Sequence, residues 1–216
     1  MSKLDFIWLF LLINPLLLTA LALGLRSFWQ QKPAQLTKLA ATLVRGVDLL
    51  SKTILEWVKW FALLMVLITT ALVISRYVFG VGSLKAQESV IYLHAGLFLF
   101  AAAGTLLYDG HVRVDVLFSR LNTRDKTIIN LLGSLFFLIP MCLLILFFSH
   151  GYVAQSWKFL EGSPEADGLH LVFLLKSAIP AFAILMLLQA SAQVLRAVLY
   201  LVGQPLTPVK PHTEMV

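Results

Sequence analysis

The sequence DGHVRVDVLFSRLNTRDK, residues 109–126, is a long polar stretch in the otherwise apolar central part of the chain. It carries four basic and three acidic side chains, and a long apolar segment lies on each side of it. Lysine and arginine accumulate in the cytoplasmic loops of membrane proteins, next to segments that cross the bilayer. The stretch therefore predicts a membrane helix, a charged cytoplasmic turn and a second membrane helix.

The composition indicates an integral membrane protein. Of the 216 residues, 59% are hydrophobic and 13% are charged, whereas soluble domains contain about 25% charged residues. The one cysteine, Cys142, allows no disulfide and no multi-cysteine metal site within one chain. The net charge of +6 does not indicate nucleic-acid binding, because the basic residues lie at the ends of apolar segments, as membrane anchors do.

Apolar segments of about 20 residues can cross the ~30 Å hydrocarbon core of a bilayer as helices. Segments of this kind predict five spans: Leu4–Leu25, Val58–Phe79, Leu84–Tyr108, Ile128–Ser149 and Leu169 to about Ser191. Proline interrupts the hydrogen bonds of a helix, so Pro140 and Pro180 predict kinks in the last two spans. We expect an interfacial extension to follow the last span through Arg196.

The amino-terminal segment, residues 1–26, is interpreted as an extra transmembrane helix. A cleaved signal peptide is the alternative, since Ala20-Leu21-Ala22 resembles a cleavage site. Lys3 is offset by Asp5, so the start of the chain lacks the clear positive charge of a signal peptide. The strongly basic residues that follow favour a retained span.

Residues 27–57 are predicted to form an amphipathic helix at the cytoplasmic interface. Apolar residues recur there at helical spacing, with most basic residues on other faces, which is typical of helices in the membrane plane. A solvated linker helix is the alternative. Residues 58–202 then form a four-helix domain, and residues 203–216 form a cytoplasmic tail.

The distribution of basic residues predicts the orientation. Twelve of the seventeen lysines and arginines fall within residues 26–59, 109–126 and 196–216. If these segments face the cytoplasm, the amino terminus lies on the outer side of the membrane and the carboxyl terminus is cytoplasmic.

Ionisable side chains inside spans are costly and are candidates for a functional role. Glu88, His94 and Lys176 lie within predicted spans, and Arg76 lies at the end of one. Because Arg76 ends one span and Glu88 begins the next, the sequence predicts that they pair at the same outer face. Lys176 enters its span from that face and could join the pair. Contact of Arg76 or Lys176 with a transported anion is the alternative.

Four histidines, His94, His111, His150 and His170, suggest a second class of protein, the membrane anchor of a redox enzyme. A haem held by two histidines needs both at one depth on facing helices, and no pair of these residues fits that requirement. The sequence has no nucleophile motif, phosphate-binding loop or HExxH metal motif. We therefore expect neither an enzyme nor a cofactor or metal site in this chain.

Several motifs resemble the small membrane subunit of tripartite ATP-independent periplasmic (TRAP) transporters, the DctQ family. These are Ser75-Arg76-Tyr77-Val78-Phe79-Gly80, Gln87-Glu88-Ser89 and the segment Asp109–Asp115, which contains the candidate residues His111, Arg113 and Asp115. The segments Glu161–Glu165 and Leu174–Pro180 resemble the mannitol/chloroaromatic branch of the family. The resemblance covers roughly residues 50–200.

The resemblance implies a four-helix scaffold subunit in the bacterial inner membrane. Its partners would be a large membrane subunit, which holds the substrate and sodium sites, and a periplasmic binding protein that delivers an organic acid. The small subunit would enlarge the fixed part of an elevator-type transporter, in contact with lipid and without a substrate site of its own. The family commonly has four spans, so the Leu4–Leu25 span is a departure that reverses the side of the amino terminus.

Overall fold

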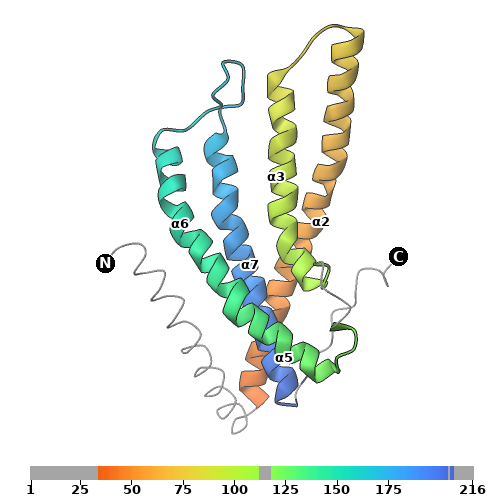
Figure 1. Cartoon of the computed structure of the whole chain (residues 1–216), viewed down its shortest axis with the longest axis vertical. Coiled ribbons are helices and arrows are strands. Elements are labelled where there is room, and N and C mark those ends of the chain that lie inside the picture. The colour runs from red at the N-terminus through yellow and green to blue at the C-terminus, as the bar shows by residue number, and fades with distance from the viewer. Residues whose placement is uncertain (1–33, 112–117, 204, 207–216) are drawn as a thin grey trace. The chain divides into compact units, whose positions relative to one another are not determined.

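The computed structural model describes residues 34–111, 118–203 and 205–206, and all regular structure in these ranges is helical (Figure 1). Four helical segments of the described chain are long and apolar enough to cross a membrane. The prediction of an all-α polytopic membrane protein is confirmed. The predicted helix at residues 1–26, most of the 203–216 tail, and the candidates Arg113 and Asp115 lie outside the described residues.

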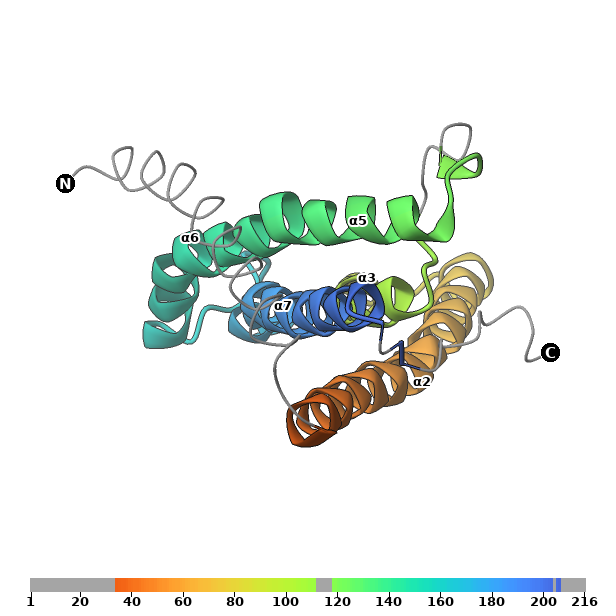
Figure 2. The same cartoon turned by 90° about the horizontal axis from the view of Figure 1, so that it is seen from below.

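The regular structure of the described chain consists of six helical elements. In chain order they are α2 (Ala34–Val78), α3 (Leu84–Leu107), α5 (Thr123–Gly133), the π-helical turn η1 (Ser134–Leu138), α6 (Ile139–Lys158) and α7 (Val172–Leu201). Figure 2 shows α5 running on into α6, so that residues 123–158 form one helical segment of 36 residues.

Helix α2 joins two elements that the sequence pattern predicts separately. It is continuous over 45 residues, or about 67 Å at ~1.5 Å per residue, which is roughly twice the thickness of a bilayer core. The expected boundary between a 27–57 helix and a Val58–Phe79 span is therefore wrong. The physical reason is that α2 contains no proline that would break it, and its one glycine, Gly46, is tolerated in a helix. The interfacial location of its first part stays a prediction.

The predicted distortion at Pro140 takes the form of a widened helical turn. The N–H of Ile139 donates to the carbonyl of Ser134, five residues back, and the π-helical turn ends directly before the proline region. Proline has no N–H to offer to the carbonyl four residues earlier, and its ring crowds that carbonyl. A widened turn is a usual way for a helix to absorb such a fault. Pro180 also lies inside a continuous helix, α7.

The end of α2 shows a structural role for one of the sequence motifs. Gly80 has a φ of 70°, in the left-handed region where glycine carries no steric cost. The chain reverses there, and the carbonyl of Ser75 accepts the N–H of Val81 at 3.1 Å. The hydroxyl of Ser75 donates to the carbonyl of Val81 at 3.0 Å. The first and last residues of the 75–80 motif thus terminate the helix.

The chain divides into two compact units. The first consists of the described parts of Met1–Leu49, Leu106–Leu143 and Met186–Val216, and the second of Leu50–Thr105 and Leu144–Leu185. Small residues dominate the buried positions of the second unit, and alanine recurs among those of the first. The buried alanines are Ala40, Ala190, Ala192 and Ala197 in the first unit and Ala103, Ala178 and Ala183 in the second.

Small residues bring α2 and α3 close together in the second unit. A Cβ added to Gly104 would lie 2.8 Å from the Cβ of Leu55, and one added to Gly96 would lie 3.0 Å from the Phe61 ring. Lipid gives no hydrophobic drive for helix association, so close van der Waals packing has to supply it. Glycine at these positions permits that packing.

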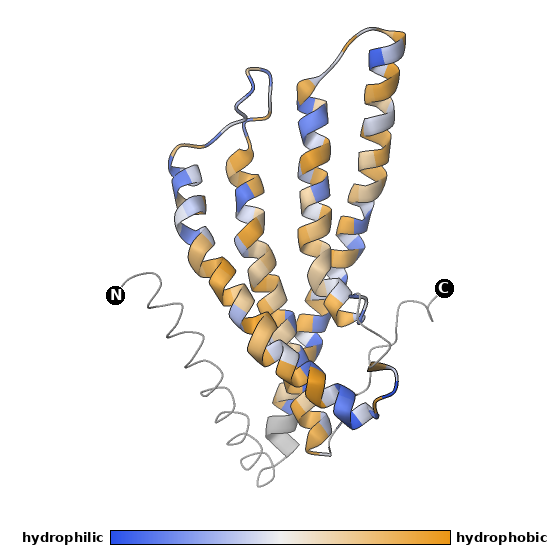
Figure 3. Cartoon of the chain, in the orientation of Figure 1, coloured by the Kyte–Doolittle hydropathy of each residue, from blue (hydrophilic) through white to orange (hydrophobic). Residues whose placement is uncertain are grey.

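Hydrophobic residues predominate along the helices, as Figure 3 shows. Trp57 and Tyr77 on α2 are 72% and 84% exposed, and Phe137 is 77% exposed. Exposed aromatic side chains in such numbers would be a liability in water but suit contact with lipid or with another membrane protein.

We expect Gly104→Ala to destabilise the protein by about 1–3 kcal/mol, because the new methyl group would force Leu55 away from α3. Gly151→Ala is the matched control, since a Cβ at this helical position has no neighbour within 4 Å. There the gain in helix propensity should leave stability unchanged or raised. Thermal unfolding in detergent measures the stability of both variants. A Gly104→Ala protein at least as stable as the wild type would contradict the packing argument.

Candidate functional site

Glu88 connects α3 to the loop between α6 and α7, residues 159–171. One oxygen of its carboxylate, Oε1, accepts a hydrogen bond from the hydroxyl of Ser163 at 2.5 Å. The other, Oε2, accepts the backbone N–H of Leu169 at 2.6 Å. Hydrogen bonds to a carboxylate are shorter and stronger than those between neutral groups. We call these three residues the Glu88 clamp.

The expected pair between Arg76 and Glu88 is wrong. Among the described residues Glu88 forms no ion pair with Arg76, whose side chain is exposed. Both oxygens of the Glu88 carboxylate are instead occupied by donors 75 and 81 positions further along the chain. The ordering of charges along neighbouring helices could not reveal these donors.

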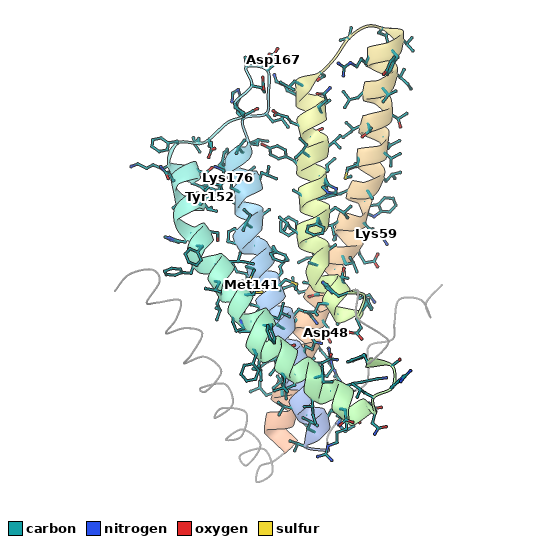
Figure 4. The ribbon with its side chains drawn as sticks, in the orientation of Figure 1. Asp48, Lys59, Met141, Tyr152, Asp167 and Lys176 are labelled. Atoms are coloured by element: carbon teal, nitrogen blue, oxygen red, sulfur yellow. The ribbon has the colours of Figure 1, made fainter. Side chains whose placement is uncertain are left out.

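Lys176 also binds the 159–171 loop. Its ammonium group donates to Oε2 of Glu161 at 2.5 Å and lies 4.0 Å from the centre of the Tyr152 ring. Figure 4 shows Lys176 and Tyr152 facing each other from α7 and α6. The lysine side chain is 15% exposed, so the anion and the aromatic face replace the water that this charge gives up. We call these three residues the Lys176 cluster.

The hydrogen bond from Lys176 lowers the pKa of Glu161 below its ordinary value, because it stabilises the charged carboxylate. Glu161 lies in the loop, outside the membrane-spanning segments, and 42% of its side chain is exposed. Solvent screens a pair of this exposure, so its contribution to stability is modest.

The ends of α6 and α7 are joined by a third set of contacts. The indole N–H of Trp157 donates to the hydroxyl of Ser177 at 2.7 Å, and its ring meets that of Phe173 edge to face at 4.8 Å. Within the loop, the N–H of Ser163 donates to the carbonyl of Leu169 at 3.0 Å. The loop is therefore bound to three helices of the second unit.

The loop glycines have no room for a side chain. A Cβ on Gly168 would lie 2.2 Å from the Ser163 hydroxyl oxygen and 2.8 Å from Oε1 of Glu88. A Cβ on Gly162 would lie 2.4 Å from Nδ1 of His170. The Glu161–Glu165 motif thus supplies Glu161 to the Lys176 cluster and Ser163 to the Glu88 clamp. Its glycine, Gly162, leaves room for the side chain of His170.

The first unit contains an ion pair that the sequence pattern does not predict. Oδ2 of Asp48 on α2 accepts a hydrogen bond from Nη2 of Arg196 on α7 at 2.6 Å. Its other oxygen accepts from the side-chain amide of Gln189 at 3.2 Å, and Gln189 is fully buried. Asp48 lies within the predicted amphipathic helix of residues 27–57, where the sequence pattern gives it no partner. The signal available was the seven-residue spacing of Gln189 and Arg196, which places both on one face of α7.

The remaining candidates take no part in these clusters. His94 and His111 are exposed, as are His150 and His170. Nothing in the described chain supports the redox-anchor alternative, because a haem would require two of these rings to face it from packed helices. Among the described residues no group of three or more histidine, cysteine, aspartate or glutamate side chains could hold a metal ion.

These features define a polytopic α-helical membrane protein whose charged side chains within the spans bind helices to one another and to a loop. The family model for tripartite ATP-independent periplasmic transporters, DctQ component, matches residues 65–199, well over half of the chain. The chain belongs to this family and is a small membrane subunit of a TRAP transporter, a multi-pass protein of the inner membrane. The family is one of transporter subunits, not of enzymes.

The family match confirms the resemblance found in the sequence, while the mannitol/chloroaromatic branch stays a prediction. No curated protein and no solved structure gives a significant match to the chain.

We expect Glu88→Gln to lower the thermal unfolding midpoint by a few degrees. The neutral amide is a weaker acceptor, and its NH₂ group would face either the Ser163 hydroxyl or the Leu169 N–H. Glu165→Gln is the control, because Glu165 is exposed on the same loop. If the two variants unfold at the same temperature as the wild type, the Glu88 clamp contributes nothing to stability.

The lowered pKa of Glu161 gives a pH dependence of defined sign. A carboxylate with a folded-state pKa below its unfolded value stabilises the fold at pH values above the unfolded-state pKa. This stabilisation is lost as the pH falls through the lower, folded-state pKa. The difference in unfolding midpoint between wild type and Glu161→Gln should thus be largest near neutral pH and shrink in acid. A difference that is constant across this range would show that the charge of Glu161 is not responsible.

Proposed function

We propose that this chain is the fixed scaffold subunit of a transporter that takes up an organic acid together with sodium ions. In this proposal a large membrane subunit holds the substrate and sodium sites, and a periplasmic binding protein delivers the acid. The membership of the DctQ family supports the role as one subunit of three. The observation that carries the scaffold role is that three charged side chains of the spans, Glu88, Lys176 and Asp48, are bound to partners within this chain.

Three interactions illustrate this use of charge. Glu88 is occupied by the 159–171 loop, Lys176 by Glu161, and Asp48 by Arg196. A substrate path needs polar groups that remain available to the solute, usually where spanning helices are broken near the bilayer centre. Here α2, α3 and α7 are continuous, and the charges reinforce the packing of the helices. Such an arrangement resists deformation.

The apolar exterior is consistent with a further membrane subunit as partner. In α2, 6% of the most apolar stretch is buried within this chain, compared with 22% in each of the other three spans. The remaining surface must be covered by lipid or by another membrane protein. Helix α2 therefore offers the largest uncovered surface for the large subunit.

The distribution of basic residues supports a periplasmic location of the 159–171 loop in this proposal. The stretch of residues 109–126, which contains four of the seventeen basic residues, would face the cytoplasm. The loop held by the Glu88 clamp and the Lys176 cluster would then face the compartment of the binding protein. The amino terminus would be periplasmic and the carboxyl terminus cytoplasmic.

Reconstitution in liposomes tests which subunits are required for uptake. We expect no sodium-driven uptake with this chain alone, and uptake when the large subunit and the binding protein are present as well. In the complete complex, Arg76→Met and Lys176→Met should leave the apparent KM for the acid and for sodium within about twofold of the wild type, because neither side chain contacts a solute. Any loss of transport activity in these variants should appear as a lower maximal rate of uptake and a smaller amount of assembled complex.

Uptake by the chain alone would contradict the proposal. So would a tenfold or larger rise in KM in the Arg76→Met or Lys176→Met complex with normal assembly, since this would indicate the anion contact that the sequence leaves open. Lys126→Met is the matched control, because Lys126 lies in α5 and contacts the ring of Phe118.

A further inference from the structure

Helix α2 carries an exposed apolar stripe that follows a seven-residue repeat. Starting at Leu39, steps of four and three residues in turn lead to Val78, and every position on this path is exposed and uncharged. Apolar side chains occupy all of these positions except Gly46 and Thr53. We call them the α2 stripe. A repeat of this kind is the pattern with which two helices pack along each other in a left-handed crossing.

Lipid does not account for the whole stripe. In its first part, the exposed basic residues Lys38, Arg45 and Lys52 alternate along the chain with Leu43 and Leu50, and hydrocarbon does not accommodate such charges. The predicted interfacial location would bury the leucines in lipid, but it requires a sharp bend before the span. Helix α2 contains no proline and no π-helical turn, which are the usual causes of sharp bends. The first part of the stripe is therefore left for a protein to cover.

A second copy of the chain does not fit the stripe. Copies of one membrane protein share one orientation, so two α2 helices related by a twofold axis would pack parallel and in register. Trp57 and Trp60 would then meet the same tryptophans in two successive layers, and Gly46 would meet Gly46. The first arrangement overfills the space between the helices, and the second leaves a void. A helix of different sequence can place small residues opposite the tryptophans and a large residue opposite the glycine.

We propose that a long helix of the large membrane subunit packs along the α2 stripe in a left-handed crossing. Its large apolar side chain lies against Gly46, and its small residues lie against Trp57 and Trp60. Trp57 is 72% exposed in this chain, so it offers a large apolar area for the contact to bury. The inference rests on the proposed function, which takes the large subunit as the membrane partner, and specifies how the two subunits meet.

Photo-crosslinking in the complete transporter tests this contact. Benzoylphenylalanine replaces Leu43, Leu67 or Ile74 on the stripe, and Val66 or Val73, exposed neighbours on another face of α2, as matched controls. We expect crosslinks to the large subunit from the three stripe positions and none from the two controls.

The other outcomes separate the inference from the proposed function. If the large subunit co-purifies with the chain but crosslinks equally to both faces, or if the stripe crosslinks to lipid or to a second copy, the inference is overturned and the proposed function stands. A large subunit that does not co-purify with the wild-type chain overturns both.

Gly46→Leu supplies a variant that spares the fold of the chain. A Cβ at Gly46 has no neighbour within 4 Å, and leucine favours a helix more than glycine does, so the chain alone should unfold at the same or a higher temperature. The new side chain would occupy the space of the partner's large residue. We therefore expect about tenfold less large subunit to co-purify.

Gly151→Leu is the matched control, because a Cβ at this position on α6 also has no neighbour within 4 Å. It should leave the amount of co-purified large subunit unchanged. Normal assembly of the Gly46→Leu complex, or an equal loss in Gly151→Leu, overturns the inference.

Discussion

A charge in a membrane-spanning helix has no water to stabilise it, so it must find a partner within the protein or at its boundary. This constraint governs the arrangement of the polar side chains in this chain. Glu88 takes two donors from the 159–171 loop, Lys176 takes a carboxylate and an aromatic face, and Asp48 takes Arg196. The contacts of Glu88 and Asp48 join segments that are 75 to 148 positions apart in the sequence, and those of Lys176 join α7 to the preceding loop and to α6.

The resulting units are suited to a mechanical role. In the second unit, Gly96 and Gly104 allow close contact of α2 with α3, and the Glu88 clamp then joins α3 to the loop that connects α6 and α7. Packing supplies most of the cohesion, and the few charge-assisted bonds specify which segments meet. In the proposed transporter, these units would form part of the support against which a transport domain moves.

The sequence is sufficient to predict much of the fold because membrane insertion depends on local properties. Apolar length predicts the spans. Gly80 and Pro140 are of residue types that end or distort helices, and the chain turns at the first and has a widened helical turn before the second. The prediction is wrong where two local patterns are compatible with one continuous helix, as in α2. Amphipathic and uniformly apolar stretches can follow each other without a break, since neither pattern ends a helix.

The candidate site is less predictable because its contacts are not local. The sequence identifies Glu88 and Lys176 by the cost of burying a charge, but it assigns Glu88 the wrong partner. The true partners lie 75 and 81 positions away, and those of Asp48 lie 141 and 148 positions away. Spacing within one helix carries no information about which distant loop or helix will meet it.

The central claim, that this subunit stays rigid during transport, is tested most directly by distance measurements in the working complex. Nitroxide labels at Ile91 on α3 and Ile184 on α7 would report on the second unit, since both positions are exposed. A fixed scaffold predicts the same distance distribution with and without the acid and sodium. A substrate-dependent shift of about 5 Å, the size of a one-turn displacement between helices, would contradict it.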